Sequence, residues 1–300
     1  MKIPNRSKHY SFGGAVCAGV VLLMASSEQA QNLFVADQNN GVIYDLAPGG
    51  AQVFANNVLS SPTALAFDSA GNLFVSDHES IYEYTPGGVE STFASGLVDA
   101  QGLAFNSAGD LFAADTDTGN IYEYTPGGVR STFASGLGGS DGLAFNSAGD
   151  LFASAGNHIY EFTPGGARST FASGLSVALG LAFNSAGDLF EADFGSLKIN
   201  EFTPGGVEST FASGLFLSPE ALAIDSTGDL FVGEIYGSGG TITEFTPGGT
   251  PVFDYSPGVE LGYPSGLAFQ PQSVPDESST LGLLGIGATA LLVRRLKLTV

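Results

Sequence analysis

The sequence predicts an all-β protein, a six-bladed β-propeller built from four-stranded antiparallel blades. Three observations predict it. The chain of 300 residues holds 43 Gly, 23 Phe and 10 Tyr but no Trp, a composition typical of many short strands joined by tight turns. A Leu-Phe pair recurs with its Phe at 34, 74, 112, 152, 190 and 231, and a Pro-Gly-Gly turn follows each pair. The repeats are spaced by 38 to 43 residues, which is within the range of propeller blades.

One repeat, residues 102–137, contains four apolar runs, GLAF, DLFAAD, NIYEYT and RSTFASGL. The turn 106–110, Asn-Ser-Ala-Gly-Asp, places Gly109 where a short hairpin needs a positive φ. The turn Pro126-Gly127-Gly128 predicts a type II turn, with proline at the first corner and glycine at the second. Both are hairpin signals, so we expect the four strands of a blade to be antiparallel.

The first apolar run, Leu-Ala-Phe or Leu-Ala-Ile, occurs six times, at 65–67, 103–105, 143–145, 181–183, 222–224 and 267–269. The second run also occurs six times, beginning at Leu33, so the chain starts with a second strand and ends with a first strand. An open array would leave both edges unpaired, which favours aggregation. We therefore expect 267–269 to pair with 32–37, so that a C-terminal first strand completes the N-terminal blade and closes the ring over residues 31–271.

The two ends of the chain have the composition of targeting segments. Residues 1–30 contain three cations, an apolar run at 12–25 and a small polar stretch, the pattern of a secretory signal peptide removed by signal peptidase. Residues 272–300 contain an apolar segment, 281–293, of thirteen residues. A helix of that length reaches about 20 Å against roughly 30 Å of hydrocarbon. We expect a short transmembrane segment that is inserted transiently, with Arg294 and Arg295 on the cytoplasmic side.

The C-terminal segment resembles a PEP-CTERM sorting signal in its Val-Pro-Asp variant. The resemblance rests on Val274, Pro275 and Asp276, followed by Ser278-Ser279-Thr280, the apolar run and the basic cluster at Arg294 and Arg295. Asp276 stands where the common form of the signal has glutamate. The resemblance implies export across the inner membrane of a Gram-negative bacterium, cleavage by an exosortase, and delivery to the cell surface or the extracellular matrix.

The repeat itself is similar to the NHL type, in the pattern G-[LI]-A-[FV]-[DN]-x-x-G-[DN]-[LI]-[FY]-V-[AS]-D. It also resembles the blades of gluconolactonase/regucalcin and streptogramin-lyase propellers. This likeness covers nearly all of 31–271 and implies the fold. It does not imply a reaction, because these families share the blade and differ in the site.

The charge of the chain excludes one class of partner. Nine Lys and Arg stand against thirty Asp and Glu, a net charge of −21, and the span 32–271 keeps only Arg130, Arg168 and Lys198 as fixed cations. Such a body repels phosphate backbones, so we expect no nucleic-acid binding. Divalent cations and cationic surfaces suit it. The single cysteine, Cys17, lies in the N-terminal apolar run, which leaves the body without a thiol or disulfide. We expect a monomer.

A site that is unique in a repetitive chain must use residues that differ between the copies. The positions just before the first strands, expected to line the central channel, are Thr63, Gln101, Asp141, Leu179, Glu220 and Ser265. Asp141 and Glu220 are the two acids among them. Ser140-Asp141-Gly142 resembles the motif that supplies a metal-binding aspartate in gluconolactonase-like enzymes, although the other ligands of that site have no counterpart here. Oxygen ligands favour Ca²⁺ over zinc, so a calcium site at Asp141 and Glu220 is one hypothesis.

The remaining candidates favour structural roles. The second strands end in Asp37, Asp77, Asp115, Ala155, Asp193 and Glu234, and we expect these carboxylates to cap the loops that follow them. His78 and His158 are placed in loops between second and third strands of non-adjacent blades, without a paired base. Residues 237–240 are expected to lengthen a loop, and 254–266 to provide slack for closing the ring.

The sequence thus favours a non-enzymatic binding or structural module of the cell surface or extracellular matrix, with a polysaccharide or protein ligand, no catalytic residues and no cofactor. The alternative is a Ca²⁺-dependent hydrolase or lactonase of the gluconolactonase-like kind that uses Asp141 and Glu220 in the central channel.

Overall fold

The structure is a computed structural model, and it describes residues 31–47, 50–55, 59–139, 141–237, 239–252 and 259–272. The predicted signal peptide, the sorting residues Val274, Pro275, Asp276, Arg294 and Arg295, and the apolar segment 281–293 lie outside the described residues. Within the described part of the chain, no helix has the length and apolar character needed to cross a membrane.

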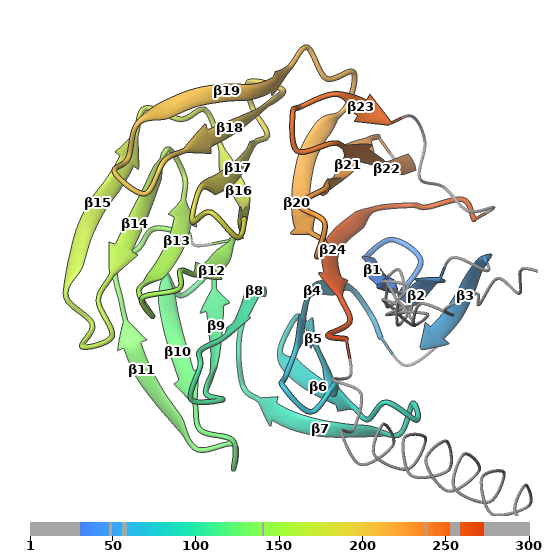
Figure 1. Ribbon diagram of the computed structural model, residues 1–300. Coiled ribbons are helices and arrows are strands. Elements are labelled where there is room, and N and C mark those ends of the chain that lie inside the picture. The colour runs from blue at the N-terminus through green and yellow to red at the C-terminus, as the bar shows by residue number, and fades with distance from the viewer. Residues whose placement is uncertain are drawn as a thin grey trace, which may run out of the picture.

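Six four-stranded antiparallel sheets form a ring (Figure 1), so the predicted fold is confirmed. Blade A contains β24 (Pro264–Phe269), β1 (Leu33–Asp37), β2 (Val42–Ala47) and β3 (Gly50–Ala55). Blade B contains β4 (Pro62–Phe67), β5 (Leu73–Asp77), β6 (Ser80–Tyr84) and β7 (Glu90–Ser95). Blade C contains β8 (Ala100–Phe105), β9 (Leu111–Asp115), β10 (Asn120–Tyr124) and β11 (Arg130–Ala134).

The second half of the ring repeats this order. Blade D contains β12 (Leu143–Phe145), β13 (Leu151–Ala155), β14 (His158–Phe162) and β15 (Arg168–Ser173). Blade E contains β16 (Ala178–Phe183), β17 (Leu189–Asp193), β18 (Lys198–Phe202) and β19 (Glu208–Ser213). Blade F contains β20 (Ser218–Ile224), β21 (Leu230–Tyr236), β22 (Gly239–Phe245) and β23 (Pro251–Val252).

The ring closes through blade A, as the count of strands predicts. β24 pairs antiparallel with β1, with Leu33 opposite Phe269 and Val35 opposite Leu267. The pairing continues beyond the strands, because the Gln270 amide donates to the Asn32 carbonyl at 3.0 Å. Segments more than 200 residues apart in the chain therefore share one sheet, and β1 and β24 pair with each other instead of leaving these edges open.

The hairpin turns follow one pattern, which confirms one turn prediction and corrects the other. Gly109 has a φ of 88°, as expected for the first turn. In the Pro-Gly-Gly turn, the positive φ of 77° is at Gly128. Gly127, the second corner of the predicted type II turn, does not have a positive φ, so the type II prediction is wrong. The Gly128 amide donates to the Thr125 carbonyl at 2.8 Å, as in three-residue hairpins in which a glycine of positive φ follows a type I turn.

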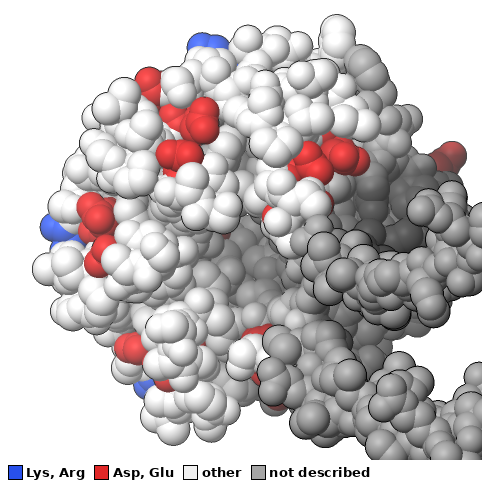
Figure 2. All heavy atoms as spheres, in the orientation of Figure 1, with Lys and Arg blue, Asp and Glu red and all other residues white. Residues whose placement is uncertain are grey.

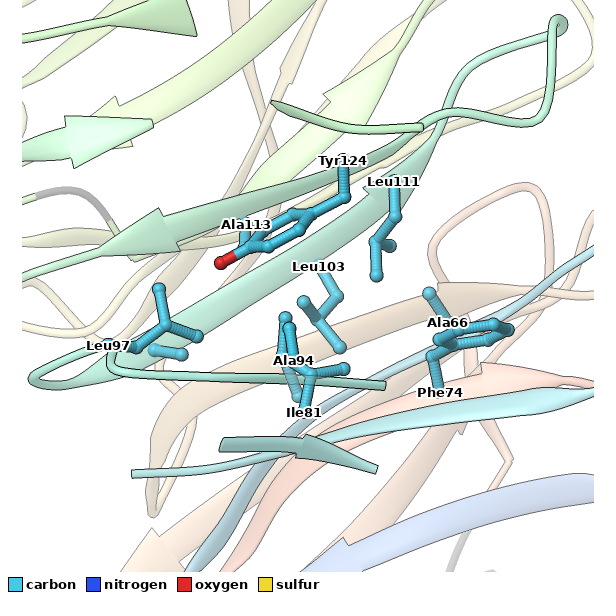
Figure 3. Close-up of a cluster of buried hydrophobic side chains, with 11 residues drawn as sticks. Ala66, Phe74, Ile81, Ala94, Leu97, Leu103, Leu111, Ala113 and Tyr124 are labelled. Atoms are coloured by element: carbon cyan, nitrogen blue, oxygen red, sulfur yellow. The ribbon is translucent and has the colours of Figure 1, made fainter. Parts of the chain in front are cut away.

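The hydrophobic core lies between the blades. The second strand of each blade is buried, except for Tyr236 at the end of β21. Neighbouring blades share one cluster of side chains, and Figure 3 shows the cluster between blades B and C. Within it, the rings of Phe74 and Phe93 meet edge to face with centroids 5.0 Å apart. Phe74 meets Phe105 of the next blade in the same way. The repeated Phe residues therefore stabilise each sheet and also join it to its neighbour.

Two further details differ from expectation. Gly239 and Gly240 belong to β22 and pair with Tyr236 and Ile235, so the 237–240 insertion extends a hairpin of blade F instead of lengthening a loop. His158 is the first residue of β14 and not part of a loop.

Candidate functional site

The innermost strands of all six blades surround a central cavity of about 220 Å³. Figure 2 shows the ring hollowed at its centre, with acidic side chains around it and few basic ones. Glycines allow the blades to approach one another closely here. A Cβ at Gly142 would lie 2.2 Å from the Leu179 carbonyl oxygen, and one at Gly102 would lie 2.2 Å from that of Asp141. The mouth is therefore formed by backbone of neighbouring blades in direct contact.

Five of the six residues expected at the channel line it: Gln101, Asp141, Leu179, Glu220 and Ser265. With the exception of Asp141, they lie within the innermost strands and not before them. Thr63 does not line the cavity, which corrects that part of the prediction. Its side chain is 1 % exposed, and its hydroxyl donates to the Ala100 carbonyl of the next blade at 2.6 Å. Thr63 therefore joins two blades.

Asp141 lies between β11 and β12, before a strand of only three residues. Its Oδ1 accepts a hydrogen bond from the Thr116 hydroxyl at 3.3 Å. Burial raises the pKa of Asp141, the Thr116 hydrogen bond lowers it, and the nearby charge of Asp99 raises it. The carboxylate is consequently a partly desolvated acceptor at the channel mouth.

Glu220 projects from β20 of blade F. Burial raises its pKa to about 7; hydrogen bonding to Tyr263 lowers it, and the charge of Asp141 raises it. The two acids of the channel mouth therefore interact electrostatically, although blade E lies between their blades in the ring. The Oε2 atom of Glu220 is buried and has no hydrogen-bond partner among the described residues. Such an atom is costly to leave unpaired, so Glu220 offers an open hydrogen-bonding position.

The donor set only partly fits the calcium hypothesis. Ca²⁺ takes six to eight oxygens, and in the described part of the chain no group of three or more His, Cys, Asp or Glu residues is arranged to hold a metal ion. Asp141 and Glu220 would have to be supplemented by the Gln101 amide, by main-chain carbonyls and by water. The channel thus provides two carboxylates and not a complete protein cage.

The four aspartates that end the second strands are structural, but most of their partners lie in different loops from those expected. Asp77 accepts the amides of Ser60 and Ser61 at 2.9 and 2.6 Å, and Asp37 accepts those of Gly262 and Tyr263 at 2.8 and 3.0 Å. Asp115 and Asp193 repeat this contact at 98–99 and 176–177. Each carboxylate therefore fixes the connector that enters its own blade, and Asp37 and Asp193 also bind the loop that follows.

The histidines lie away from the channel. The Nδ1 atom of His78 is 3.7 Å from Asp99 Oδ1, and the side chain is half exposed. The ring of His158 stacks on Tyr160 with centroids 5.5 Å apart. Neither residue lines the central cavity.

Sequence reasoning missed one polar position in the core and expected a different role, that of a loop cap, for another. Glu191 is fully buried in β17 and accepts a hydrogen bond from Asn200 Nδ2 at 2.9 Å. Glu234 of β21 is 5 % exposed and lines a second cavity between blades E and F. A comparison of the repeats at the middle of the second strand would have identified Glu191, because the other five blades have valine or alanine there.

Comparison with solved structures supports the fold. No family model matches the chain, and no relative is found among curated proteins. A nidogen/laminin complex contains a chain with a TM-score of 0.72 and 19 % identity, covering 81 % of this chain and 100 % of that one. A gluconolactonase from Xanthomonas campestris has a TM-score of 0.64 and 15 % identity, and the match covers 78 % of this chain and 87 % of that one. Virginiamycin B lyase from Staphylococcus aureus has a TM-score of 0.61 and 16 % identity, and the match covers 80 % of this chain and 89 % of that one. At these identities the similarity shows a shared propeller fold.

Proposed function

We propose that this protein is a non-catalytic binding propeller that captures a cationic side chain of a protein ligand at the channel mouth. The observation that carries the proposal is the buried, unpartnered Oε2 of Glu220, a residue that lines the central cavity together with Asp141. A cavity of about 220 Å³ is below the usual range of small-molecule sites, roughly 300–1,000 Å³. It suits one inserted side chain better than a whole ligand.

Charge and shape both favour an ammonium group. The net charge of −21 attracts cations from a distance. Leu residues of the innermost strands line the same cavity as the two acids, and they suit the apolar stem of lysine, which packs along hydrophobic surface while its charge meets a carboxylate. An ammonium also supplies the donors that Glu220 Oε2 lacks.

The test is calorimetric titration of the purified protein with a short lysine-containing peptide and with its norleucine counterpart. We expect binding of the lysine peptide, weakened about 10- to 100-fold by Asp141→Asn or Glu220→Gln, as for loss of a hydrogen bond to a charged group. Affinity is expected to rise between pH 6 and 8, because Glu220 with a pKa of about 7 becomes charged there. Asp150→Asn, in the turn that joins β12 to β13 of blade D, is the matched control for loss of one charge. Equal affinity for the two peptides would refute the proposal.

The competing function is a calcium-dependent hydrolase or lactonase, supported by the fold shared with a gluconolactonase. Ca²⁺ titration in the same calorimeter separates the two. Stoichiometric Ca²⁺ binding that disappears in Asp141→Ala would support the hydrolase. Lysine-peptide binding that is unchanged by millimolar Ca²⁺ and by a chelator would support the binding module.

We also propose that the propeller acts outside the cytoplasm after exosortase sorting, supported by the terminal sequence patterns. Mass spectrometry of the protein from its producing cell is expected to show loss of residues 1–30 and of the segment after about Pro275, since the resemblance implies cleavage near Val-Pro-Asp. A mature chain that still ends at Val300 would refute the sorting proposal without affecting the binding proposal.

A further inference from the structure

A second cavity, of about 580 Å³, lies between blades E and F, away from the channel. Its lining is mainly apolar and includes Phe211, Leu215 and Phe245. Phe216, at the same cavity, is 96 % exposed. Glu234 and Thr243 supply polar groups to the lining. The volume lies in the range of small-molecule sites.

The cavity exists because blade F lacks an aromatic ring that four other blades have. The middle residue of the third strand is Tyr44, Tyr82, Tyr122 or Tyr160 in blades A to D, and each is opposite the middle residue of the second strand. These tyrosines pack against the clusters shared with the preceding blade. At the same register, blade F has Thr243 opposite Val232. The space that a phenol ring occupies elsewhere is left open between E and F.

Blade E provides an internal control. It has Asn200 in place of the tyrosine, but Glu191 stands directly opposite and the two side chains are hydrogen bonded. A polar pair thus occupies the tyrosine position there. Blade F has a small residue at the third strand and an apolar valine opposite, so neither a tyrosine ring nor a polar pair fills the interface between blades E and F.

Two more departures from the repeat meet at the same cavity. Glu234 replaces the aspartate that ends the second strand in four blades. The connector from blade E to F is one residue longer: Leu215 and Leu222 are seven positions apart, whereas Leu97 and Leu103 are six. Burial raises the pKa of Glu234 to about 7, and hydrogen bonding to Thr243 lowers it. Three local changes therefore coincide at the interface between blades E and F.

We propose that this interface is a second binding site, for a small monophenol whose ring takes the position of the absent tyrosine and whose hydroxyl faces Glu234. The sibling blades indicate the orientation. In blade A, the charge of Asp37 acts on Tyr44, and Asp37 is the counterpart of Glu234. In blade C, the Tyr122 hydroxyl accepts a hydrogen bond from Asn120 at 3.1 Å, and Asn120 is the counterpart of Thr241. A phenol in the cavity would therefore have a polar partner for its hydroxyl and Phe211 and Phe245 beside its ring.

The experiment is calorimetric titration of the full chain with p-cresol and with toluene. We expect saturable binding of one p-cresol per chain, and binding of toluene weakened about fivefold by the missing hydrogen bond. Thr243→Tyr refills the cavity and is expected to abolish p-cresol binding while keeping or raising the melting temperature. Thr92→Tyr, which introduces the same ring at an exposed position of β7 in blade B, is the matched control and should retain the affinity within about threefold.

A methyl-resolved NMR titration keeps the proposal testable if Thr243→Tyr does not fold. p-Cresol is expected to shift the methyl signals of Leu215 and Val232 at the E/F interface and to leave those of Val35 and Leu46 at the F/A interface unchanged. The proposal is refuted if p-cresol does not bind at millimolar concentration, if Thr243→Tyr binds it as tightly as the wild type, or if the shifts occur at both interfaces. Asp141→Asn and Glu220→Gln should leave p-cresol binding unchanged, so this result is independent of the channel-mouth proposal.

Discussion

Deletion of residues 263–270 is expected to abolish cooperative folding of the propeller. The deletion removes β24, which forms the whole inner edge of blade A and contacts β1, β4 and β20. Leu267 is buried in the cluster that joins blades F and A. The free energy lost with Leu267 and with the hydrogen bonds of β24 exceeds the net stability of a typical domain, which is about 5–15 kcal/mol. The measurement is differential scanning calorimetry with size-exclusion chromatography, in which we expect no sharp transition and the appearance of oligomers.

A circular permutant is the control for this deletion. It moves residues 263–269 in front of Leu33 through a linker with the sequence of 106–110, the turn that joins first and second strands within blade C. Blade A is then covalently continuous, and we expect a monomer with a single melting transition. A deletion variant that melts as sharply as the wild type, within a few degrees, would show that β24 is dispensable and that the ring does not depend on this closure.

The free energy of unfolding is expected to fall as the pH rises from about 5 to 8, because of carboxyl groups held protonated in the folded state. Burial raises the pKa of Glu191 from 4.5 to about 8; Asn200 lowers it by hydrogen bonding, and the charges of Asp193 and Glu208 raise it. In this window the folded state keeps a proton that the unfolded state has released. Stability is therefore fully present below the unfolded pKa and is lost as the pH rises through the folded one.

The slope for one such group is about 1.4 kcal/mol per pH unit, so Glu191 alone contributes a loss on the order of several kcal/mol across the window. Urea denaturation at intervals of half a pH unit measures it. Glu191→Gln, which cannot ionise, is expected to flatten the profile, and exposed Glu79→Gln is the matched control that should leave it unchanged. Parallel profiles for the wild type and Glu191→Gln would contradict the assignment. Glu220 and Glu234, each with a pKa of about 7, act in the same direction.

The fold could be predicted because every blade repeats the same local signals. Alternating apolar runs, hairpin glycines such as Gly109, and equal numbers of first and second strands determine six sheets and the closure of 267–269 on β1. Local patterns were less reliable where two backbone conformations suit one sequence. Pro126-Gly127-Gly128 satisfies both a type II turn and a type I turn followed by a glycine of positive φ, and the pairing of strands β10 and β11 selects the second.

The candidate site was only partly accessible in this way. Counting back from the first strands identified Asp141 and Glu220 as the two unusual acids, but the depth of each side chain depends on contacts from other blades. Thr63 occupies an equivalent sequence position and is turned into an inter-blade hydrogen bond. The aspartates that end the second strands were recognised as caps, yet the amides bound by Asp77, Asp115 and Asp193 include ones 16 or 17 residues earlier in the chain. Asp37 binds amides more than 200 residues later, and loop rules do not cover such distances.

The sequence by itself thus determined the repeat, the blade, the number of blades and the place where the ring closes, because these depend on periodicity and turn chemistry that each segment carries locally. Only the tertiary structure decided what lies between the blades. The open space beside Thr243, the buried pair of Glu191 and Asn200, and the unpartnered oxygen of Glu220 arise where side chains from separate repeats meet. Their burial, and with it their protonation and binding capacity, is a property of the closed ring and of no single repeat.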